Sequence, residues 1–185
     1  MTIVEKKKLE RDKFKKLRDE ITPNQRQKVE NNVKRYIDFF VKEYKNIGYI
    51  AIYFPLKNEV DLTTLKEKNS LALPRCNEKK ELLFYPWDET PLTKDSEGIL
   101  SPNKSFSLSF KEISIILVPC LSVDKNLIRL GYGGGYFDKL RRDENWRDVP
   151  CIGVLTSNCV STTPLTRADW DIPLSGFITE KEIIV

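Results

Sequence analysis

The chain has 185 residues and a net charge of +4, with 40% hydrophobic and 31% charged residues. This length and composition are typical of one globular domain with a sizeable core, and acidic residues interrupt every basic run, so a nucleic-acid partner is not expected. The chain contains no histidine, which excludes His-based acid–base catalysis, Ser-His and Cys-His nucleophile pairs and histidine metal sites.

Two helices are predicted at the N-terminus. Thr2 and Glu5 have the spacing of a capping box, and Thr22 and Gln25 repeat it with Pro23 at the first helical position. The second helix is expected to end near residues 46–48. Its apolar stripe has helical periodicity and is predicted to pack in the core: Val29, Val33, Tyr36, Ile37, Phe40, Val41 and Tyr44.

Short strands alternate with helical segments along the rest of the chain. Residues 49–54 form a buried-looking strand that Pro55 stops, and Asp61 is positioned to cap a short helix that reaches Lys68. The other predicted strands cover residues 71–74, 82–85, 113–118 and 151–155. The alternation predicts one domain over residues 1–185, an α/β three-layer sandwich with a largely parallel central sheet and an N-terminal helical pair.

Residues 86–110 carry Pro, Ser, Asp and Gly with little periodicity and are predicted to form a long loop, a feature that often serves as a lid. The four cysteines, Cys76, Cys120, Cys151 and Cys159, show no CxxC spacing. We therefore expect reduced thiols in a cytoplasmic protein and no zinc site. No apolar run approaches membrane-spanning length, and the charged start does not fit a signal peptide.

The most informative segment runs from Arg129 to Lys139 and reads RLGYGGGYFDK, with four glycines within five positions. Glycine lets a ligand approach main-chain amides, and amides at a helix N-terminus bind phosphate. The P-loop and the dinucleotide fingerprint are both excluded by spacing, because Tyr136 stands where each motif needs another residue type. The segment is predicted to hold phosphate, and a flexible hairpin turn is the plainer alternative.

The residues that frame the glycines allow two interpretations each. Arg129 can pair with phosphate oxygens or form a surface ion pair. Asp138 lies in the first turn of the predicted helix, where a carboxylate is favoured, and it is also suited to Mg²⁺. Ligands of open α/β sheets collect beyond the carboxyl ends of the strands, so the site is expected after the strand at 113–118.

The segment from Arg129 to Asp138 resembles the signature of the 5-formyltetrahydrofolate cyclo-ligase (methenyltetrahydrofolate synthetase) family, which usually has a second Tyr in place of Phe137. The resemblance covers nearly the whole chain. Further matching segments occur in the family's order at residues 58–61, 73–75, 115–124, 170–171 and 178–180.

The resemblance implies ATP-dependent cyclisation of 5-formyltetrahydrofolate to 5,10-methenyltetrahydrofolate, with release of ADP and phosphate. It implies ATP and Mg²⁺ as cofactors and a folate substrate that can carry a polyglutamate tail. The nucleophiles of this reaction belong to the substrate, which suits a chain without histidine. We expect a monomer with no nucleic-acid or membrane partner.

The resemblance also implies a set of site residues, with Arg129 and Tyr136 in catalysis. The ATP-binding residues would be Lys7, Arg11, Arg129, Leu130, Gly131, Tyr132, Gly133, Gly134, Gly135 and Tyr136. The substrate-binding residues would be Phe54, Glu59, Tyr132, Gly133, Gly134, Gly135 and Tyr136. The metal ligands would be Asp138 and Asp171. Without the resemblance, Glu59 is a surface loop residue, Phe54 a core residue, and Lys7 and Arg11 part of a solvated helix.

The chain departs from the family pattern in places. Glu10 precedes Arg11 where the family usually has Leu, so Leu17-Arg18 competes for the alignment, and Ser101 stands where the family usually has Glu. Three alternatives therefore stay open. They are a nucleotide-binding module of the same fold that has lost or changed its folate activity, a different small phosphotransferase that uses the same loop, and RNA binding through the Lys-rich start.

Overall fold

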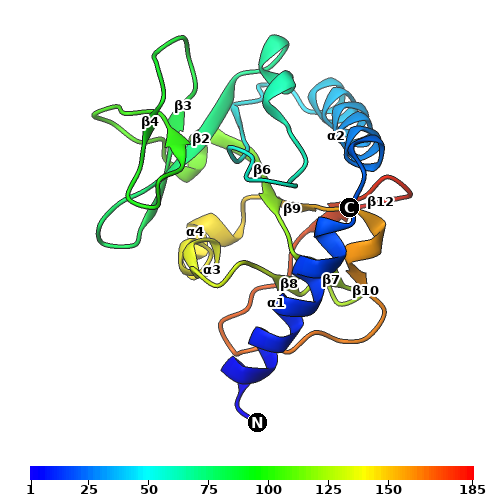
Figure 1. The fold of residues 1–185 in the computed structure, drawn as a ribbon. Coiled ribbons are helices and arrows are strands. Elements are labelled where there is room, and N and C mark those ends of the chain that lie inside the picture. The colour runs from blue at the N-terminus through cyan, green and yellow to red at the C-terminus, as the bar shows by residue number, and fades with distance from the viewer.

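The computed structural model describes residues 1–185 and is built on a seven-stranded sheet with the order β12-β11-β9-β6-β1-β2-β3 (Figure 1). The five inner strands run parallel, and the edge strands β3 and β12 pair antiparallel. The strands are β1 (Tyr49–Ala51), β2 (Leu71–Cys76), β3 (Leu82–Pro86), β6 (Ile113–Pro119), β9 (Cys151–Val154), β11 (Gly176–Ile178) and β12 (Ile183–Ile184). The expected α/β fold with a largely parallel sheet is confirmed.

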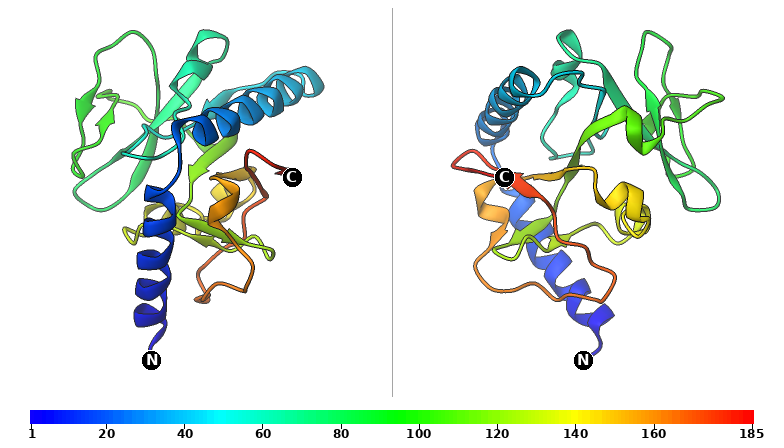
Figure 2. Two further views of the ribbon diagram at one scale, coloured as in Figure 1. Left: turned by 45° about the vertical axis from the view of Figure 1, so that its right-hand side comes forward. Right: turned by 180° about the vertical axis from the view of Figure 1, so that it is seen from behind.

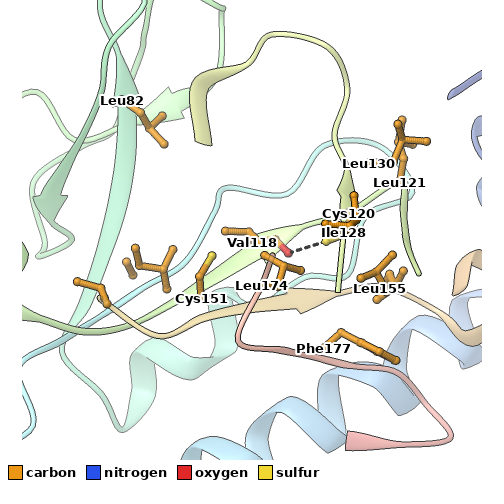
Figure 3. Close-up of a cluster of buried hydrophobic side chains, with 14 of the residues drawn as sticks. Leu82, Val118, Cys120, Leu121, Ile128, Leu130, Cys151, Leu155, Leu174 and Phe177 are labelled. Carbon is orange, nitrogen blue, oxygen red and sulfur yellow. Dashed lines mark hydrogen bonds between the residues drawn. The ribbon is translucent and has the colours of Figure 1, made fainter. Parts of the chain in front are cut away.

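Alternating side chains of the inner strands divide the core between the two faces of the sheet. Ile115 and Leu117 of β6 belong to one cluster, which helix α2 (Pro23–Glu43) covers with Val29, Val33 and Ile37. On the other face, Ile116 and Val118 join a cluster that helices α3 and α4 adjoin. Figure 3 shows part of this second cluster, where Cys120, Cys151 and Leu174 lie around Val118. All four cysteines are buried thiols.

Both N-terminal helices begin at the predicted capping boxes, α1 (Ile3–Asp19) at Thr2 and α2 at Thr22. They run in different directions, so that α2 lies over the large sheet while α1 extends toward β7 and β8 (Figure 2). The predicted stripe on α2 is too long, because Val41 and Tyr44 are exposed. Helix α2 ends at Glu43, so Tyr44 lies beyond its last turn, where its ring packs on that of Phe40 with the centroids 4.7 Å apart. None of the helices combines the length and apolarity needed to cross a lipid bilayer.

A second, three-stranded sheet holds the glycine segment and was not predicted. Its order is β10 (Val160–Ser161), β7 (Ser122–Asp124) and β8 (Arg129–Leu130). The buried Asp124 carboxylate accepts hydrogen bonds from the N–H groups of Asn126, Ile128 and Leu165, which fixes the turn between β7 and β8. The glycines then follow β8 and lead into α3 (Tyr136–Leu140) and α4 (Glu144–Arg147).

Residues 86–110 contain a hairpin of β4 (Thr93–Lys94) and β5 (Leu100–Ser101), where a structureless loop was expected. Its turn is made by Asp95, whose carboxylate accepts from the N–H groups of Glu97 and Ile99, and by Gly98 at φ 77°. Such turn chemistry carries no hydrophobic periodicity, which explains why periodicity missed the strands. Short 3-10 helices complete the fold at η1 (Thr63–Glu67), η2 (Phe110–Glu112) and η3 (Ser157–Cys159).

Candidate active site

The glycine segment forms an exposed loop over a buried cation. Gly133 and Gly135 have φ of 111° and 73°, a backbone region that side chains disfavour, and Gly135 caps α3. Beneath them the Arg129 guanidinium donates to the Pro119 carbonyl at 3.1 Å and to Asp138 Oδ1 at 3.2 Å. A Cβ on Gly131 would lie 2.9 Å from that guanidinium. These contacts fix the conformation of the loop, so the alternative of a flexible hairpin turn does not describe it.

One face of α1 lies against this loop. Lys7, Arg11, Phe14 and Arg18 follow one another at helical spacing, and Phe14 is buried in the core. Arg11 Nε donates to the Gly131 carbonyl at 2.9 Å, and Arg18 donates to the Tyr132 hydroxyl. Arg11 and Arg18, the two residues that compete for the alignment of the N-terminal motif, therefore both contact the glycine segment. This face of α1 packs against the protein and is not solvated.

Each predicted metal ligand is paired with a predicted phosphate cation. Asp171 is buried, forms an ion pair with Lys7, and accepts from the Ala168 N–H at 2.6 Å. Asp138 pairs with Arg129. No group of three or more carboxylate or thiol side chains is assembled that could hold a metal ion by itself. In each ion pair the cation balances the negative charge of the carboxylate.

A pocket opens beside the loop at the carboxyl ends of β1, β6 and β9. The chain order of the strands changes direction between β1 and β6, and ligands of open α/β sheets bind at such a switch point. More than half of the lining residues are hydrophobic, and the polar ones come from segments far apart in the chain. The pocket is lined by Arg18, Ile21, Arg26, Tyr53, Asn58, Glu59, Val60, Pro119, Cys120, Tyr132, Val154, Leu155, Thr156 and Cys159.

Glu59 is the acidic group of this pocket. Its Oε2 accepts from the Leu56 N–H at 2.7 Å, the Tyr132 hydroxyl donates to the same carboxylate, and Glu59 forms no ion pair. Burial raises the pKa of Glu59, and the neighbouring Tyr132 hydroxyl and Arg18 guanidinium oppose that rise. Burial and the Glu59 carboxylate likewise raise the pKa of Tyr132. A buried carboxylate without an ion-pair partner is suited to accept a hydrogen bond from a ligand.

Tyr136 lies at the start of α3 and donates its hydroxyl hydrogen to the Glu97 carboxylate in the β4–β5 hairpin. This hydrogen bond and burial raise the pKa of Tyr136 to about 12. The phenol therefore stays protonated at neutral pH, so it can donate a hydrogen bond but cannot act as a base. The contact also brings the hairpin against the glycine segment.

The structure separates some of the predicted site residues. Phe54 does not line the pocket, because it packs against the cluster on the α2 side, and the neighbouring Tyr53 lines the pocket instead. Leu130 is buried in the core, which leaves only its main chain to face a ligand. Sequence reasoning missed Tyr53 and Thr156, although both follow parallel strands at their carboxyl ends, and it ranked Arg18 only as a competitor of Arg11.

Comparison with known proteins decides the family. A model of the 5-formyltetrahydrofolate cyclo-ligase family matches residues 3–180. The chain belongs to this family. Its activity is that of a 5-formyltetrahydrofolate cyclo-ligase, an ATP-dependent ligase of folate one-carbon metabolism.

The chain aligns over most of its length with other members of the family. The 5-formyltetrahydrofolate cyclo-ligase of Haemophilus influenzae is 29% identical over 175 residues, covering 89% of this chain and 92% of that protein. The solution structure of 5,10-methenyltetrahydrofolate synthetase from Aquifex aeolicus shares 29% identity with a TM-score of 0.79, over 96% of this chain and 91% of that one. The Mycoplasma pneumoniae synthetase, 21% identical, has the same fold with a TM-score of 0.72, over 94% and 98% of the two chains.

Proposed function

We propose that residues 1–185 act as one domain that closes the ring of 5-formyltetrahydrofolate at the junction of the glycine segment and the pocket beside it. One observation carries this assignment of the site. The exposed glycine loop is flanked by two exchangeable ion pairs, Lys7–Asp171 and Arg129–Asp138, and it adjoins a pocket at the switch point of the sheet.

The nucleotide half consists of the loop amides and the cations beneath and beside them. The N–H groups of Gly133, Gly134 and Gly135 are proposed to donate to phosphate oxygens, and Lys7, Arg11 and Arg129 to neutralise them. When the triphosphate enters, its oxygens replace the carboxylates on Lys7 and Arg129. This exchange costs little electrostatically, because each cation keeps an anionic partner throughout.

The same exchange frees Asp138 and Asp171 to hold Mg²⁺. The donor set fits, because this hard ion takes one or two carboxylates together with phosphate oxygens and does not need an all-protein cage. The hydrogen bond from Arg129 occupies only Oδ1 of Asp138, which leaves Oδ2 as a ligand. When bound, the ion would neutralise charge on the reacting phosphate.

The folate half is the pocket lined by Glu59, Tyr53 and Tyr132. Tyr132 lies in the glycine segment and also lines the pocket, so a folate held there meets the nucleotide half at this residue. Glu59 would accept hydrogen bonds from the folate, and Tyr136 would turn its single hydroxyl hydrogen from Glu97 to a phosphate oxygen. The protein supplies position and charge, not a nucleophile.

The reaction then proceeds in two steps within the substrate. The formyl oxygen attacks the γ-phosphorus, which forms an O–P bond and breaks the bond to the bridging oxygen, so ADP leaves with the electron pair. The secondary amine of the folate next attacks the activated formyl carbon and loses its proton. The C–O bond breaks, and inorganic phosphate carries the former formyl oxygen away.

The departure at Ser101 does not favour an inactive module. Ser101 is fully buried, and its hydroxyl accepts from Arg75 at 2.9 Å. Arg75 also donates to the Thr93 hydroxyl and to the carbonyls of Pro102 and Lys94. The serine thus anchors the β4–β5 hairpin through an uncharged contact, which leaves the proposed site unaltered.

Formation of a methenyl-folate tests the proposal, because this product absorbs in the near ultraviolet. The pure protein is mixed with 5-formyltetrahydrofolate, ATP and Mg²⁺, and each component is omitted in turn. We expect a signal that requires all three. A protein that binds MgATP in calorimetry but gives no signal would contradict the proposal and support a re-purposed nucleotide-binding module.

The proposal extends to the state of the protein in the cell. We propose a cytoplasmic monomer that accepts polyglutamylated folates. Four buried thiols, none of them in a disulfide, support a reducing compartment. Light scattering of the purified protein measures its mass directly, and a mass of twice 21.5 kDa would contradict the monomer.

A further inference from the structure

The proposed metal ligand Asp171 lies in a long segment without helix or strand, residues 162–174, which we call the strap. The strap leaves β10, crosses the N-terminal half of α1 and returns to the large sheet at β11 (Figure 1). Glu10 of α1 holds its first part, because the Glu10 carboxylate accepts from the N–H and the hydroxyl of Thr166 at 2.9 and 2.8 Å. Asp171 lies further along the strap, where this contact no longer fixes the backbone.

Two side chains from outside the strap form hydrogen bonds with the residues around Asp171. Lys7 pairs with the Asp171 carboxylate itself. The second is Arg141, which donates from one terminal nitrogen to the carbonyl of Ile172 at 3.1 Å and to that of Pro173 at 2.8 Å. Arg141 therefore holds the main chain directly after Asp171.

Arg141 is an unfavourable residue for the place that it occupies. Its exposed fraction is 6%, it forms no ion pair, and its Nε is buried without a partner. An arginine stays charged when it is buried, and removing a charge from water without an ion-pair partner is costly. An apolar side chain would fill the space without this cost. What the arginine adds is its pair of hydrogen bonds to the strap.

Arg141 also connects the strap to the second proposed metal ligand. It is the C-terminal cap of α3, and Asp138 lies three positions earlier in the same helix, so both side chains project from one side of it. The connection from Asp138 to Asp171 thus consists of one helical turn and one guanidinium. Mg²⁺ demands near-ideal octahedral geometry, so the spacing of its two carboxylates matters.

We propose that Arg141 is a positioning residue that keeps Asp171 at the spacing from Asp138 that a shared Mg²⁺ needs. It touches neither substrate nor metal and acts through the Ile172 carbonyl. Its contribution is largest when nucleotide is bound, because the triphosphate then replaces Asp171 on Lys7 and the contacts from Arg141 remain. The inference rests on the proposed function, since it assumes that exchange and the two metal ligands.

The test separates the contribution of the metal from that of the nucleotide. Calorimetry measures the Kd of ATP with excess Mg²⁺ and again with a chelator, and the ratio of the chelator value to the Mg²⁺ value reports the metal. We expect Arg141→Met to lower this ratio by about tenfold, the lower end of what losing an outer-shell partner costs. The Kd of ATP with chelator and the Kd of 5-formyltetrahydrofolate without nucleotide should each stay within about twofold, because neither contact depends on the strap.

Two further variants control for the loss of an arginine and for folding. Arg141→Lys keeps a charged donor that reaches one carbonyl, so it should lower the ratio by only about threefold, and it tests the inference even where the methionine variant is unstable. Arg147→Met removes an exposed arginine of α4 whose hydrogen bond is to the Arg142 carbonyl. This matched control should leave all three Kd values unchanged.

Asp171→Asn shows whether Arg141 acts through Asp171. The asparagine should lower the ratio by itself, because it removes the charge of a metal ligand. In this background Arg141→Met should lower the ratio by less than about a further twofold, since two residues that act through one another are not additive.

Several outcomes would overturn the inference. One is an unchanged ratio in Arg141→Met, and another is an equal weakening of ATP with chelator and of folate, which would make Arg141 a general support of the fold. A third is that the effects of Arg141→Met and Asp171→Asn multiply, which would mean that Arg141 acts independently of Asp171. Failure of the proposed function is distinguishable, because wild-type protein would then form no methenyl-folate, whereas failure of this inference appears only in the variants.

Discussion

The two halves of the site treat their polar groups in opposite ways. Around the glycine segment two cations are paired with carboxylates, Lys7 with Asp171 and Arg129 with Asp138. In the adjoining pocket the buried Glu59 carboxylate forms hydrogen bonds but no ion pair, and Nε of Arg18 is buried without a partner. In the glycine half a ligand can replace one partner of an ion pair. In the pocket a ligand can supply a partner to a buried polar group that lacks one. A highly charged triphosphate suits exchange, while a neutral, flat ring suits unmet donors and acceptors.

The comparison predicts different costs for the protein itself. The ion pairs stabilise the protein when no nucleotide is bound, whereas a buried carboxylate without an ion-pair partner destabilises it. Substitutions in the glycine half should therefore reduce catalysis without raising stability. Substitutions in the pocket should reduce binding and raise stability at the same time.

The largest effect is expected from Gly134→Val. A Cβ at this position would lie 2.8 Å from the Tyr136 ring, so the side chain forces the loop out of shape where phosphate is proposed to bind. Loss of preorganised donors should lower the rate of methenyl formation by about 100-fold or more. Folate affinity measured without nucleotide should remain within about threefold, because Gly134 does not line the pocket. An equal loss of rate and of folate affinity would mean that the two halves act as one site, which would contradict the comparison.

Asp138→Asn should have the next largest effect. The asparagine keeps the size of the side chain but loses the charge that pairs with Arg129 and that Mg²⁺ needs. We expect the Mg²⁺ concentration for half-maximal rate to rise at least about tenfold, the lower end of what losing even an outer-shell partner costs. Titration of the steady-state rate with Mg²⁺ measures this value. An unchanged midpoint would remove Asp138 from the metal site.

Glu59→Gln sharpens the comparison, because it should stabilise the protein while weakening folate binding. Burial raises the pKa of Glu59, so the native state favours the protonated form and wild-type protein loses stability as the pH rises above 4.5, the ordinary value. At pH 8 the glutamine variant should melt roughly 2–4 °C higher, which corresponds to about 1 kcal/mol for a chain of this size. The gain should shrink toward pH 4. Thermal melts across this pH range that show wild type equal or more stable throughout would contradict the account.

The smallest effect is expected from Tyr136→Phe. The hydroxyl donates to Glu97, and its pKa, raised to about 12, keeps it protonated. Removing one such donor should lower kcat by less than about tenfold. The pH–rate profile between pH 6 and 10 should keep its shape. A loss of three orders of magnitude, or the disappearance of a basic limb, would mean that the phenol transfers a proton.

The parts of the fold that depend on local pattern could be predicted from the sequence. Both capping boxes, the strand at 113–118 and the glycine segment rest on residues near one another in the chain. The hairpin at 93–101 and the sheet of β7, β8 and β10 could not be predicted, because Asp95 and Asp124 build them through side-chain bonds to main-chain N–H groups. Such bonds leave no periodic trace in the sequence.

In the site, too, residues that are close in the chain could be predicted and residues that are far apart could not. The glycine half carries a motif whose residues are contiguous, so its candidate residues were found. The pocket joins Arg18, Tyr53, Glu59, Tyr132 and Thr156 from four separate segments, and only folding brings them together. The helical spacing of Arg18 with the buried Phe14 was the one available signal that Arg18 faces inward. It could not reveal that the Nε atom lacks a partner.

The most direct test of ATP-driven ring closure follows the formyl oxygen. 5-Formyltetrahydrofolate labelled with ¹⁸O in the formyl group is converted by the protein with unlabelled MgATP, and the released phosphate is examined by mass spectrometry. Attack of the formyl oxygen on the γ-phosphate predicts one ¹⁸O atom in each phosphate formed. Unlabelled phosphate, with the label found in water, would contradict the proposed activation step.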